Sequence, residues 1–371
     1  MDPYTHHDVH EELNAISSSL QTVMDRYSAM MLNMSNNEQI NKITNETDVV
    51  PLSVLAAPNA EPLPVDQVVQ EAFQVFDYRT RTNHPLFFSF IPSPASPLSV
   101  LGECLNSSFN TFAGCKFQGS GPSLIEKTLI AWLAERIGLP ASAGGVFVSG
   151  GSMANLTAMA VARDRKLPHG EHERGVAYMS DQTHSSLAKA LRILGFAKSQ
   201  IRCLPSDYKF EMIPETLEKA IQEDREAGLI PFAVIATCDS FATDADYLRD
   251  VTEEEDVPNF WNYGMELTRP SRGMKLWFTM RVLGAETLGR MIDQGFYLAE
   301  QAELALRKRE EWEIISPAKM AILNFRFAPP GKSESELDAL NMAISKKLFL
   351  ENVAGILTTK IELLERVNLD R

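Results

Sequence analysis

Two short segments carry groups that could do chemistry, and the first is Gly150-Gly151-Ser152. These residues follow a predicted strand, Gly145–Val148, and open an alanine-rich segment, Met153–Arg163, that predicts a helix. The N–H groups and the positive dipole end at such a helix start can hold a phosphate group. Glycine turns of this kind also serve packing alone, so both interpretations stay open here. The segment is not a P-loop and lacks the spaced glycines of a dinucleotide fold.

The second segment runs from Asp181 to Ser186 and contains His184. It follows the next predicted strand at its carboxyl end, where open α/β sheets place their ligands. A lone histidine is more often a structural residue, but this position makes His184 a candidate functional residue.

Strands and helices alternate around these segments and predict an α/β fold with a parallel sheet covered on both faces. A capping box formed by Ser123 and Glu126 predicts a helix that starts at Ser123. After residue 180 the expected elements are a helix at 185–194, a strand at 200–204, a helix at 214–227 and a strand at 232–237.

Both ends of the chain differ from this alternating region. A helix is expected at about 8–33, within an arm that spans residues 1–65. A large domain is expected at 66–285, and a small α+β domain at 286–371. The elements expected in the small domain are helices near 287–309 and 335–351 and strands near 312–315, 320–327 and 356–362.

Composition excludes several function classes. The formal charge of -14 and the absence of a clustered basic face argue against nucleic-acid binding. No basic region leads into an apolar run, and no stretch approaches a membrane span, so a cytoplasmic location is expected. The four cysteines are widely spaced and form no Cys-x-x-Cys pair, so no metal site is predicted.

Several segments, taken in order, resemble the group II pyridoxal-phosphate-dependent amino-acid decarboxylases, which include the aromatic amino-acid, glutamate and diaminobutyrate enzymes. They are His84–Pro97, Gly144–Asn155, Asp181–Ser186 and Ser271–Phe278. The resemblance covers nearly all of the chain from about residue 65. It implies the fold type I of pyridoxal-phosphate enzymes, a large parallel-sheet domain with a small α+β domain, and a homodimer.

The resemblance also implies roles for individual residues. Gly151 and Ser152 match the positions that hold the phosphate of pyridoxal 5'-phosphate, and His184 matches the histidine that stacks on its pyridine ring. The cofactor serves these enzymes as an electron sink, and the stacked imidazole fixes the plane of the ring from one face.

The stretch that should carry the Schiff-base lysine is absent from this sequence. In the family, this lysine and the carboxylate partner of the pyridine nitrogen lie between the segments matching Phe232–Thr237 and Ser240–Tyr247. Here only Cys238 and Asp239 stand between them. On the order of 80 residues, three strand-helix units, should therefore be missing, and with them central strands of the sheet. Lys275 lies in a matching segment of its own, so we interpret it as structural.

Phe260 is a second departure from the family pattern. It aligns with a mobile-loop position where many relatives carry a tyrosine that protonates the carbanion. Phenylalanine cannot donate a proton, and in some relatives this change accompanies aldehyde formation.

Two hypotheses follow from the resemblance. In the first, the intact relative or intact gene product is a homodimeric L-amino-acid carboxy-lyase, and a gene-model error or splice form explains the missing stretch. In the second, the chain is a catalytically inactive relative that acts by pairing with another subunit. The substrate stays open, because the segments that would line its pocket are placed only roughly, near Phe87–Pro92 and Phe117.

Overall fold

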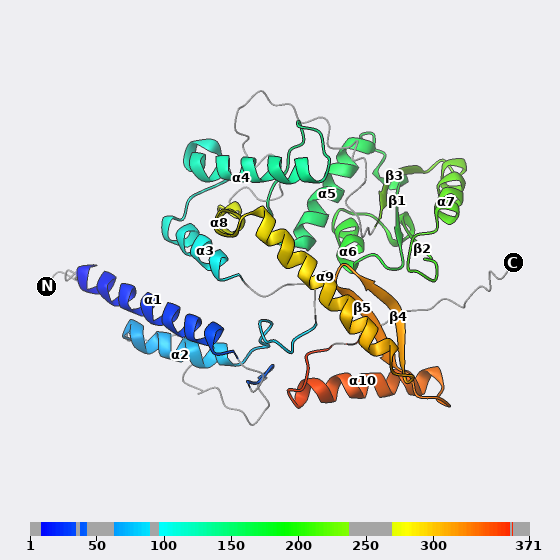
Figure 1. The fold of residues 1–371 in the computed structure, drawn as a ribbon. Helices are drawn as coiled ribbons and strands as arrows, with labels where there is room; N and C mark the ends of the chain where they lie inside the picture. Colours follow the sequence, from blue (N-terminus) through cyan, green and yellow to red (C-terminus); the bar gives the residue numbers. More distant parts are fainter. Residues whose placement is uncertain are drawn as a thin grey trace. The chain divides into compact units, whose positions relative to one another are not determined.

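The structure is a computed structural model that describes residues 9–34, 38–42, 63–89, 96–236, 269–356 and 358, with the backbone alone for 9–12. Its contacts form two compact units (Figure 1). One comprises Met1–Ala95 with Arg326–Lys360, and the other Ser96–Phe325 with Ile361–Arg371. The division into 1–65, 66–285 and 286–371 stays a prediction. Phe260, the junction at Cys238 and Asp239, and most of the strand expected at 356–362 lie outside the described residues.

The larger unit contains a parallel sheet of three strands. The strands are β1 (Gly175–Ser180), β2 (Ile201–Leu204) and β3 (Ile230–Ile235), in the order β2-β1-β3. Both neighbours run parallel to β1, and Tyr178 is in register with Arg202 on one side and Val234 on the other. Every residue of β1 is buried. The expected α/β fold with a parallel sheet is therefore confirmed.

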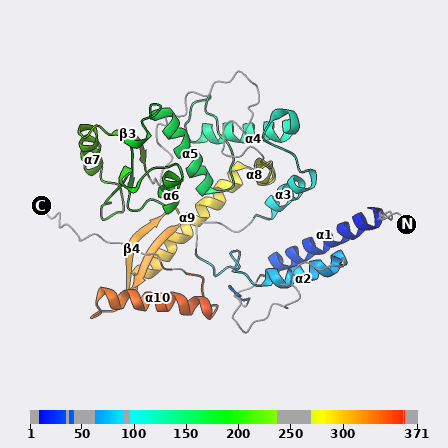
Figure 2. The same ribbon diagram turned by 180° about the vertical axis from the view of Figure 1, so that it is seen from behind.

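Helices cover both faces of this sheet, because successive strand residues point to opposite sides. Ala177 and Met179 of β1 pack against α5 (Gly151–Lys166) and α6 (Ser185–Ile193). The alternate residues Val176 and Tyr178 pack instead against α7 (Pro214–Glu226). Figures 1 and 2 show α7 on one side of the strands, with α5 and α6 on the other.

The buried carboxylate of Asp224 on α7 connects this helix to the sheet. The Tyr178 hydroxyl donates to Asp224 Oδ2 at 2.7 Å, and the Arg202 guanidinium donates to both oxygens of the same carboxylate at 3.0 and 2.5 Å. Burial and the bond to Asp224 raise the pKa of Tyr178 well above its usual value. The hydrogen bonds from Arg202 and Tyr178 lower the pKa of Asp224 against the opposing effect of burial. This carboxylate is therefore ionised in the folded protein at neutral pH.

The larger unit also contains elements outside this sheet. Helices α3 (Pro97–Phe109) and α8 (Gly273–Leu283) approach each other closely, since a Cβ on Gly102 would come within 2.8 Å of the Met274 carbonyl oxygen. The turn at Met320 and Ala321, both at positive φ, closes a two-stranded hairpin. The elements are α3 (Pro97–Phe109), α4 (Lys116–Arg136), η1 (His172–Arg174), η2 (Lys198–Gln200), α8 (Gly273–Leu283), α9 (Ala285–Arg307), β4 (Trp312–Lys319) and β5 (Ile322–Phe327). The long helix and the two strands expected near 287–327 are thus confirmed.

Two local predictions are wrong. The helix expected to start at Ser123 begins at Lys116 and continues past a non-helical residue, Gly119. The capping box does not form, because the Glu126 carboxylate binds Arg269 instead of capping the helix. Residues Gly145–Val148 are not a strand either, and within the described chain their backbone has no strand partner.

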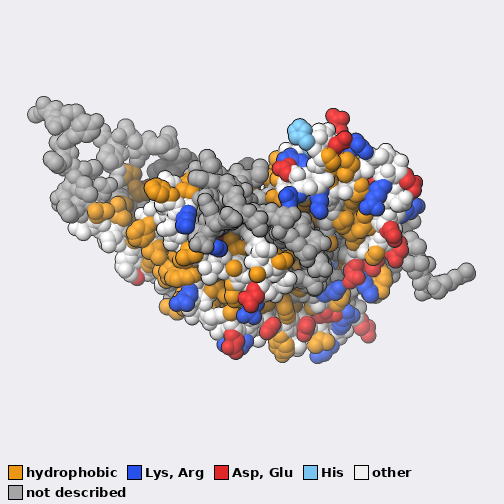
Figure 3. Space-filling view, turned by 90° about the horizontal axis from the view of Figure 1, so that it is seen from above, with side chains coloured by type: hydrophobic (Ala, Val, Ile, Leu, Met, Phe, Trp, Pro, Cys, Tyr) orange, Lys and Arg blue, Asp and Glu red, His pale blue; other side chains and the backbone are white. Residues whose placement is uncertain are grey.

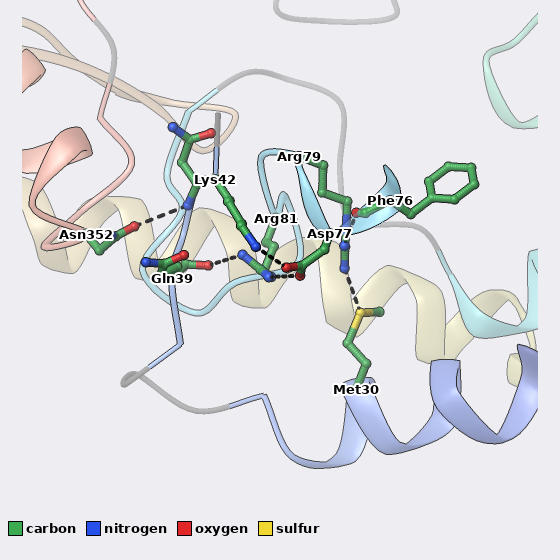
Figure 4. A network of polar contacts seen from close by, with 9 residues as sticks. Met30, Gln39, Lys42, Phe76, Asp77, Arg79, Arg81 and Asn352 are labelled. Carbon is green, nitrogen blue, oxygen red and sulfur yellow. Dashed lines mark hydrogen bonds and ion pairs between the residues drawn. The ribbon is translucent and has the colours of Figure 1, made fainter. Parts of the chain in front are cut away.

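The smaller unit contains the expected first helix, α1 (Val9–Leu32), with α2 (Val65–Asp77) packed against it, and α10 (Glu334–Leu350). Asp77 lies at the centre of the polar network in Figure 4, where it accepts from Lys42 at 2.6 Å and from Arg81 at 2.8 Å. The hydrogen bond from Lys42 lowers the pKa of the Asp77 carboxyl. In the same network Asn352 accepts from the Asn41 amide and so connects the two chain segments of this unit.

None of the helices in the described ranges combines the length and the apolar character that crossing a bilayer requires.

Candidate functional site

The first part of the candidate site is the start of α5. Gly150 precedes the helix at φ 150° and ψ 173°, a backbone conformation that L side chains rarely adopt, and its carbonyl accepts from the amides of Met153 and Ala154 at 3.0 Å. No side chain caps this helix, so the amides of Gly151 and Ser152 are among the free donors of its first turn. A Cβ on either glycine would meet nothing within 4 Å among the described atoms. The open helix start is therefore suited to an anion.

Charges along α5 favour an anion at the same end. The first turn carries no acidic residue, and the last turn carries Arg163, Arg165 and Lys166. This distribution complements the helix dipole and leaves no carboxylate on the first turn to compete with a phosphate.

The second part is His184, which stands at the N-cap of α6. Its Nδ1 accepts from the Ser186 amide at 3.2 Å and lies 2.6 Å from the Ser186 hydroxyl. A backbone amide can only donate, so in the neutral ring Nδ1 carries no proton and the proton lies on Nε2. The His184 side chain is exposed, and Nε2 has no hydrogen-bond partner among the described residues. One edge of the ring is thus fixed while its other nitrogen is available.

A contact between α5 and α6 joins these two parts. Asn155 Nδ2, one turn into α5, donates to the Ser186 hydroxyl at 2.8 Å. The sequence predicts roles for Gly151, Ser152 and His184 but none for Asn155 or Ser186. Both stand at the ends of the segments Gly144–Asn155 and Asp181–Ser186, which was the signal available in the sequence.

A buried ion pair holds the segment that leads into the glycine turn. Arg269 Nη2 lies 2.6 Å from Glu126 Oε1 and donates to the Phe147 carbonyl at 2.7 Å, while the Phe147 amide donates to the same Glu126 oxygen at 2.9 Å. The Glu126 and Arg269 side chains are 1% and 2% exposed. Arg269 Nη1 also donates to the Ala113 carbonyl at 3.2 Å. Both polar groups of the Phe147 backbone are therefore satisfied by one ion pair, four residues before Gly151.

Lysine is absent from a long part of the sequence. The sequence contains none between Lys219 and Lys275. Lys275 lies on α8 and pairs with Glu103 at 2.7 Å. This contact agrees with a structural role for Lys275 and gives it no role in the site.

The family model described as the pyridoxal-dependent decarboxylase conserved domain matches residues 48–242 and 238–328. The chain belongs to the pyridoxal-dependent decarboxylase family. The resemblance found in the sequence is thereby confirmed, together with pyridoxal 5'-phosphate as the cofactor of the family and carboxy-lyase chemistry as its activity. The two matched segments meet at residues 238–242, where the missing stretch was inferred.

Several enzymes are similar to this family member. An aromatic-L-amino-acid decarboxylase of Bacillus atrophaeus is 32% identical over 370 residues, with 78% of this chain and 77% of that protein covered. A phenylacetaldehyde synthase of Arabidopsis thaliana is 26% identical, with 79% and 80% covered. The crystal structure of Catharanthus roseus tryptophan decarboxylase in complex with L-tryptophan gives a TM-score of 0.80 at 19% identity and covers 97% of this chain and 91% of that one. The similarity to this solved structure confirms fold type I.

The described residues fit one part of the family cofactor and leave another part without a partner. The open start of α5 suits the phosphate, and the exposed ring of His184 is available beside it. The covalent attachment has no candidate, because residues 220–274 contain no lysine.

Proposed function

We propose that this chain binds pyridoxal 5'-phosphate without a covalent bond and does not decarboxylate amino acids, whereas an intact form of the gene product is an L-amino-acid decarboxylase. The observation that carries the proposal is the absence of lysine from residues 220–274, where the resemblance places the attachment point. The family match also breaks at residues 238–242, within this range.

The length of one alignment supports a missing stretch. The alignment with the Bacillus atrophaeus enzyme runs over 370 residues but occupies 78% of this chain, about 289 of 371 residues. About 81 positions, the difference between 370 and 289, then have no counterpart here. This agrees with a loss on the order of 80 residues, or three strand-helix units.

Three residues have roles in this proposal. The amides of Gly151 and Ser152 bind the phosphate at the start of α5, and His184 packs against the pyridine ring and holds its plane. When bound in an intact relative, the cofactor supplies an electron sink for the electron pair released as the carboxylate leaves. Orientation by His184 serves that step, since the breaking bond must stand out of the ring plane.

A cofactor titration tests the proposal. Purified chain is mixed with pyridoxal 5'-phosphate, treated with borohydride and passed over a desalting column, with the Bacillus atrophaeus enzyme as the lysine-containing control. We expect saturable binding by equilibrium dialysis and no cofactor retained after desalting, whereas the control retains it. Cofactor fixed to this chain in a one-to-one ratio would contradict the proposal.

Transcript sequencing distinguishes a gene-model error from a true deletion. Reads across the codons for Cys238 and Asp239 that contain a lysine-encoding insert would restore the enzymatic assignment to the gene product. For that longer product Phe260 becomes relevant, because the similar phenylacetaldehyde synthase of Arabidopsis thaliana favours an aldehyde as the alternative to an amine. Product analysis with an aromatic L-amino acid would distinguish the two.

A second candidate function is pairing with another subunit, and exposed apolar side chains favour it. Figure 3 shows hydrophobic side chains grouped among charged ones on one face of the molecule. Helix α9 has no buried residue, and half or more of the surface of Ile292, Tyr297 and Leu298 is exposed. On α1, Leu20 is 51% exposed. Side chains of this kind suit a homodimer or a heterodimer with an intact homologue.

Co-expression tests the pairing function. The tagged chain and an untagged intact homologue are co-expressed as cytoplasmic proteins. The tagged chain is captured by affinity, and the captured protein is analysed by size-exclusion chromatography. Elution of both chains at the mass of a dimer is the expected result. An intact homologue that elutes alone would exclude a heterodimer, and a monomeric mass for the chain alone would exclude the homodimer.

A further inference from the structure

The contact between α5 and α6 has a defined direction. The side-chain amide of Asn155 donates to the Ser186 oxygen at 2.8 Å, so that oxygen is the acceptor. The Ser186 hydroxyl proton then points to the one remaining close partner, His184 Nδ1 at 2.6 Å. Since Nδ1 already accepts from the Ser186 amide, it has no proton of its own to give. The three side chains form a donor chain that runs from Asn155 through Ser186 to His184.

Helix capping does not require this arrangement. The start of α6 is capped by His184, whose Nδ1 accepts from the Ser186 amide and whose carbonyl accepts from the Leu187 amide. The Ser186 hydroxyl adds nothing to these two bonds. Ser186 is nonetheless only 7% exposed, and among the described residues its hydroxyl forms hydrogen bonds with the side chains of Asn155 and His184 alone. A buried hydroxyl between two partners on different helices is a means of fixing one against the other.

We propose that Asn155 and Ser186 are positioning residues that orient the His184 ring, with its proton on Nε2, relative to the start of the phosphate-binding helix. The inference rests on the proposed function, because it gives the orientation a purpose: the phosphate site and the ring-stacking imidazole are held as one unit. Asn155 belongs to the helix that would bind the phosphate, so its amide transmits the position of that helix to the imidazole.

A substitution that reverses the chain tests its direction. In Asn155→Asp the carboxylate can only accept, so the Ser186 hydroxyl turns toward residue 155 and presents its lone pairs to His184. The tautomer of His184 with the proton on Nδ1 should then increase. The reporter is the pair of ring-nitrogen resonances of His184 in cofactor-free, histidine-labelled protein, identified as the signals that His184→Gln removes.

Double variants separate a hydrogen-bonded chain from a simple charge effect. In Asn155→Asp combined with Ser186→Ala the central hydroxyl is gone, so the tautomer shift should disappear. In Asn155→Asp combined with Ser185→Ala the shift should persist, because Ser185 is the neighbouring exposed serine. A shift that survives Ser186→Ala would mean that the aspartate acts through its charge alone, and it would overturn the proposal. An unchanged spectrum of Asn155→Asp would overturn it as well, provided that circular dichroism shows the native fold.

Cofactor affinity provides an independent measurement. Ser186→Ala is expected to weaken the binding of pyridoxal 5'-phosphate roughly 2- to 10-fold, the effect of one hydrogen bond. Ser185→Ala should bind like the unmodified chain. Tautomer shifts as expected without any cofactor binding would refute the proposed function and leave the positioning role intact. Normal cofactor binding with unchanged tautomers would refute the positioning role and leave the proposed function intact.

Discussion

Removal of the Glu126 charge should destabilise the protein strongly. Glu126→Gln keeps the shape of the side chain but removes the negative charge that faces the Arg269 guanidinium, at a site where both side chains are almost fully buried. The loss of one partner from a buried ion pair costs about 3–5 kcal/mol. The glutamine oxygen can still accept both of the bonds that Glu126 Oε1 now accepts, so we expect about 3 kcal/mol, the lower end of that range.

An exposed ion pair in the same unit is the matched control. Lys275 and Glu103 are 51% and 47% exposed at 2.7 Å, so Glu103→Gln should change the free energy of unfolding by less than about 1 kcal/mol. Urea unfolding followed by tryptophan fluorescence measures both variants. Equal effects of Glu126→Gln and Glu103→Gln would refute this reasoning.

Two further predictions concern acid stability and the glycine turn. Because the hydrogen bond from Arg202 lowers the folded pKa of Asp224, its contribution to stability is complete above the unfolded pKa of about 3.9 and is lost as the pH falls through the folded value. Unfolding midpoints should therefore fall as the pH is lowered below about 3.9 in the unmodified chain, and they should fall less steeply in Asp224→Asn. Gly150→Ala should cost about 1–3 kcal/mol in thermal or urea unfolding, because alanine is strained at φ 150°. Gly151→Ala, at a helical position with open space around it, should be neutral for stability.

Elements with local signals could be predicted from the sequence. The periodic apolar residues of α1 and α9 and the proline at the first turn of α7 identified helices that the structure contains. The apolar run at 176–179 predicted a buried strand, and the structure contains it within β1, where all six residues are buried. In each of these elements the sequence within one turn or one strand carries the information that determines the structure.

The failed strand at Gly145–Val148 shows where local signals end. A short apolar run bounded by glycines is typical of a buried strand, and the sequence contains no other sign at this point. The backbone of Phe147 instead bonds to Glu126 and Arg269, which lie 21 residues before it and 122 residues after it. The same pair removed Glu126 from its expected capping box. A contact between residues 126 and 269 leaves no periodic pattern in the sequence, so one unseen ion pair accounts for both errors.

The candidate site could be predicted only in part, because local signals identify some of its residues and contacts between distant residues determine the others. Gly151, Ser152 and His184 follow expected strands, and the edge at the carboxyl ends of parallel strands is a general place for ligands. The series of hydrogen bonds from Asn155 through Ser186 to His184 depends on how α5 packs against α6, and this packing cannot be predicted from a local sequence pattern. These residues all lie between positions 150 and 186, next to the buried strand β1, whereas the lysine of the family belongs to a separate region. The proposed loss of that region would remove covalent attachment and leave in place the residues proposed to hold the phosphate and the ring, so cofactor binding and catalysis can be tested separately in this chain.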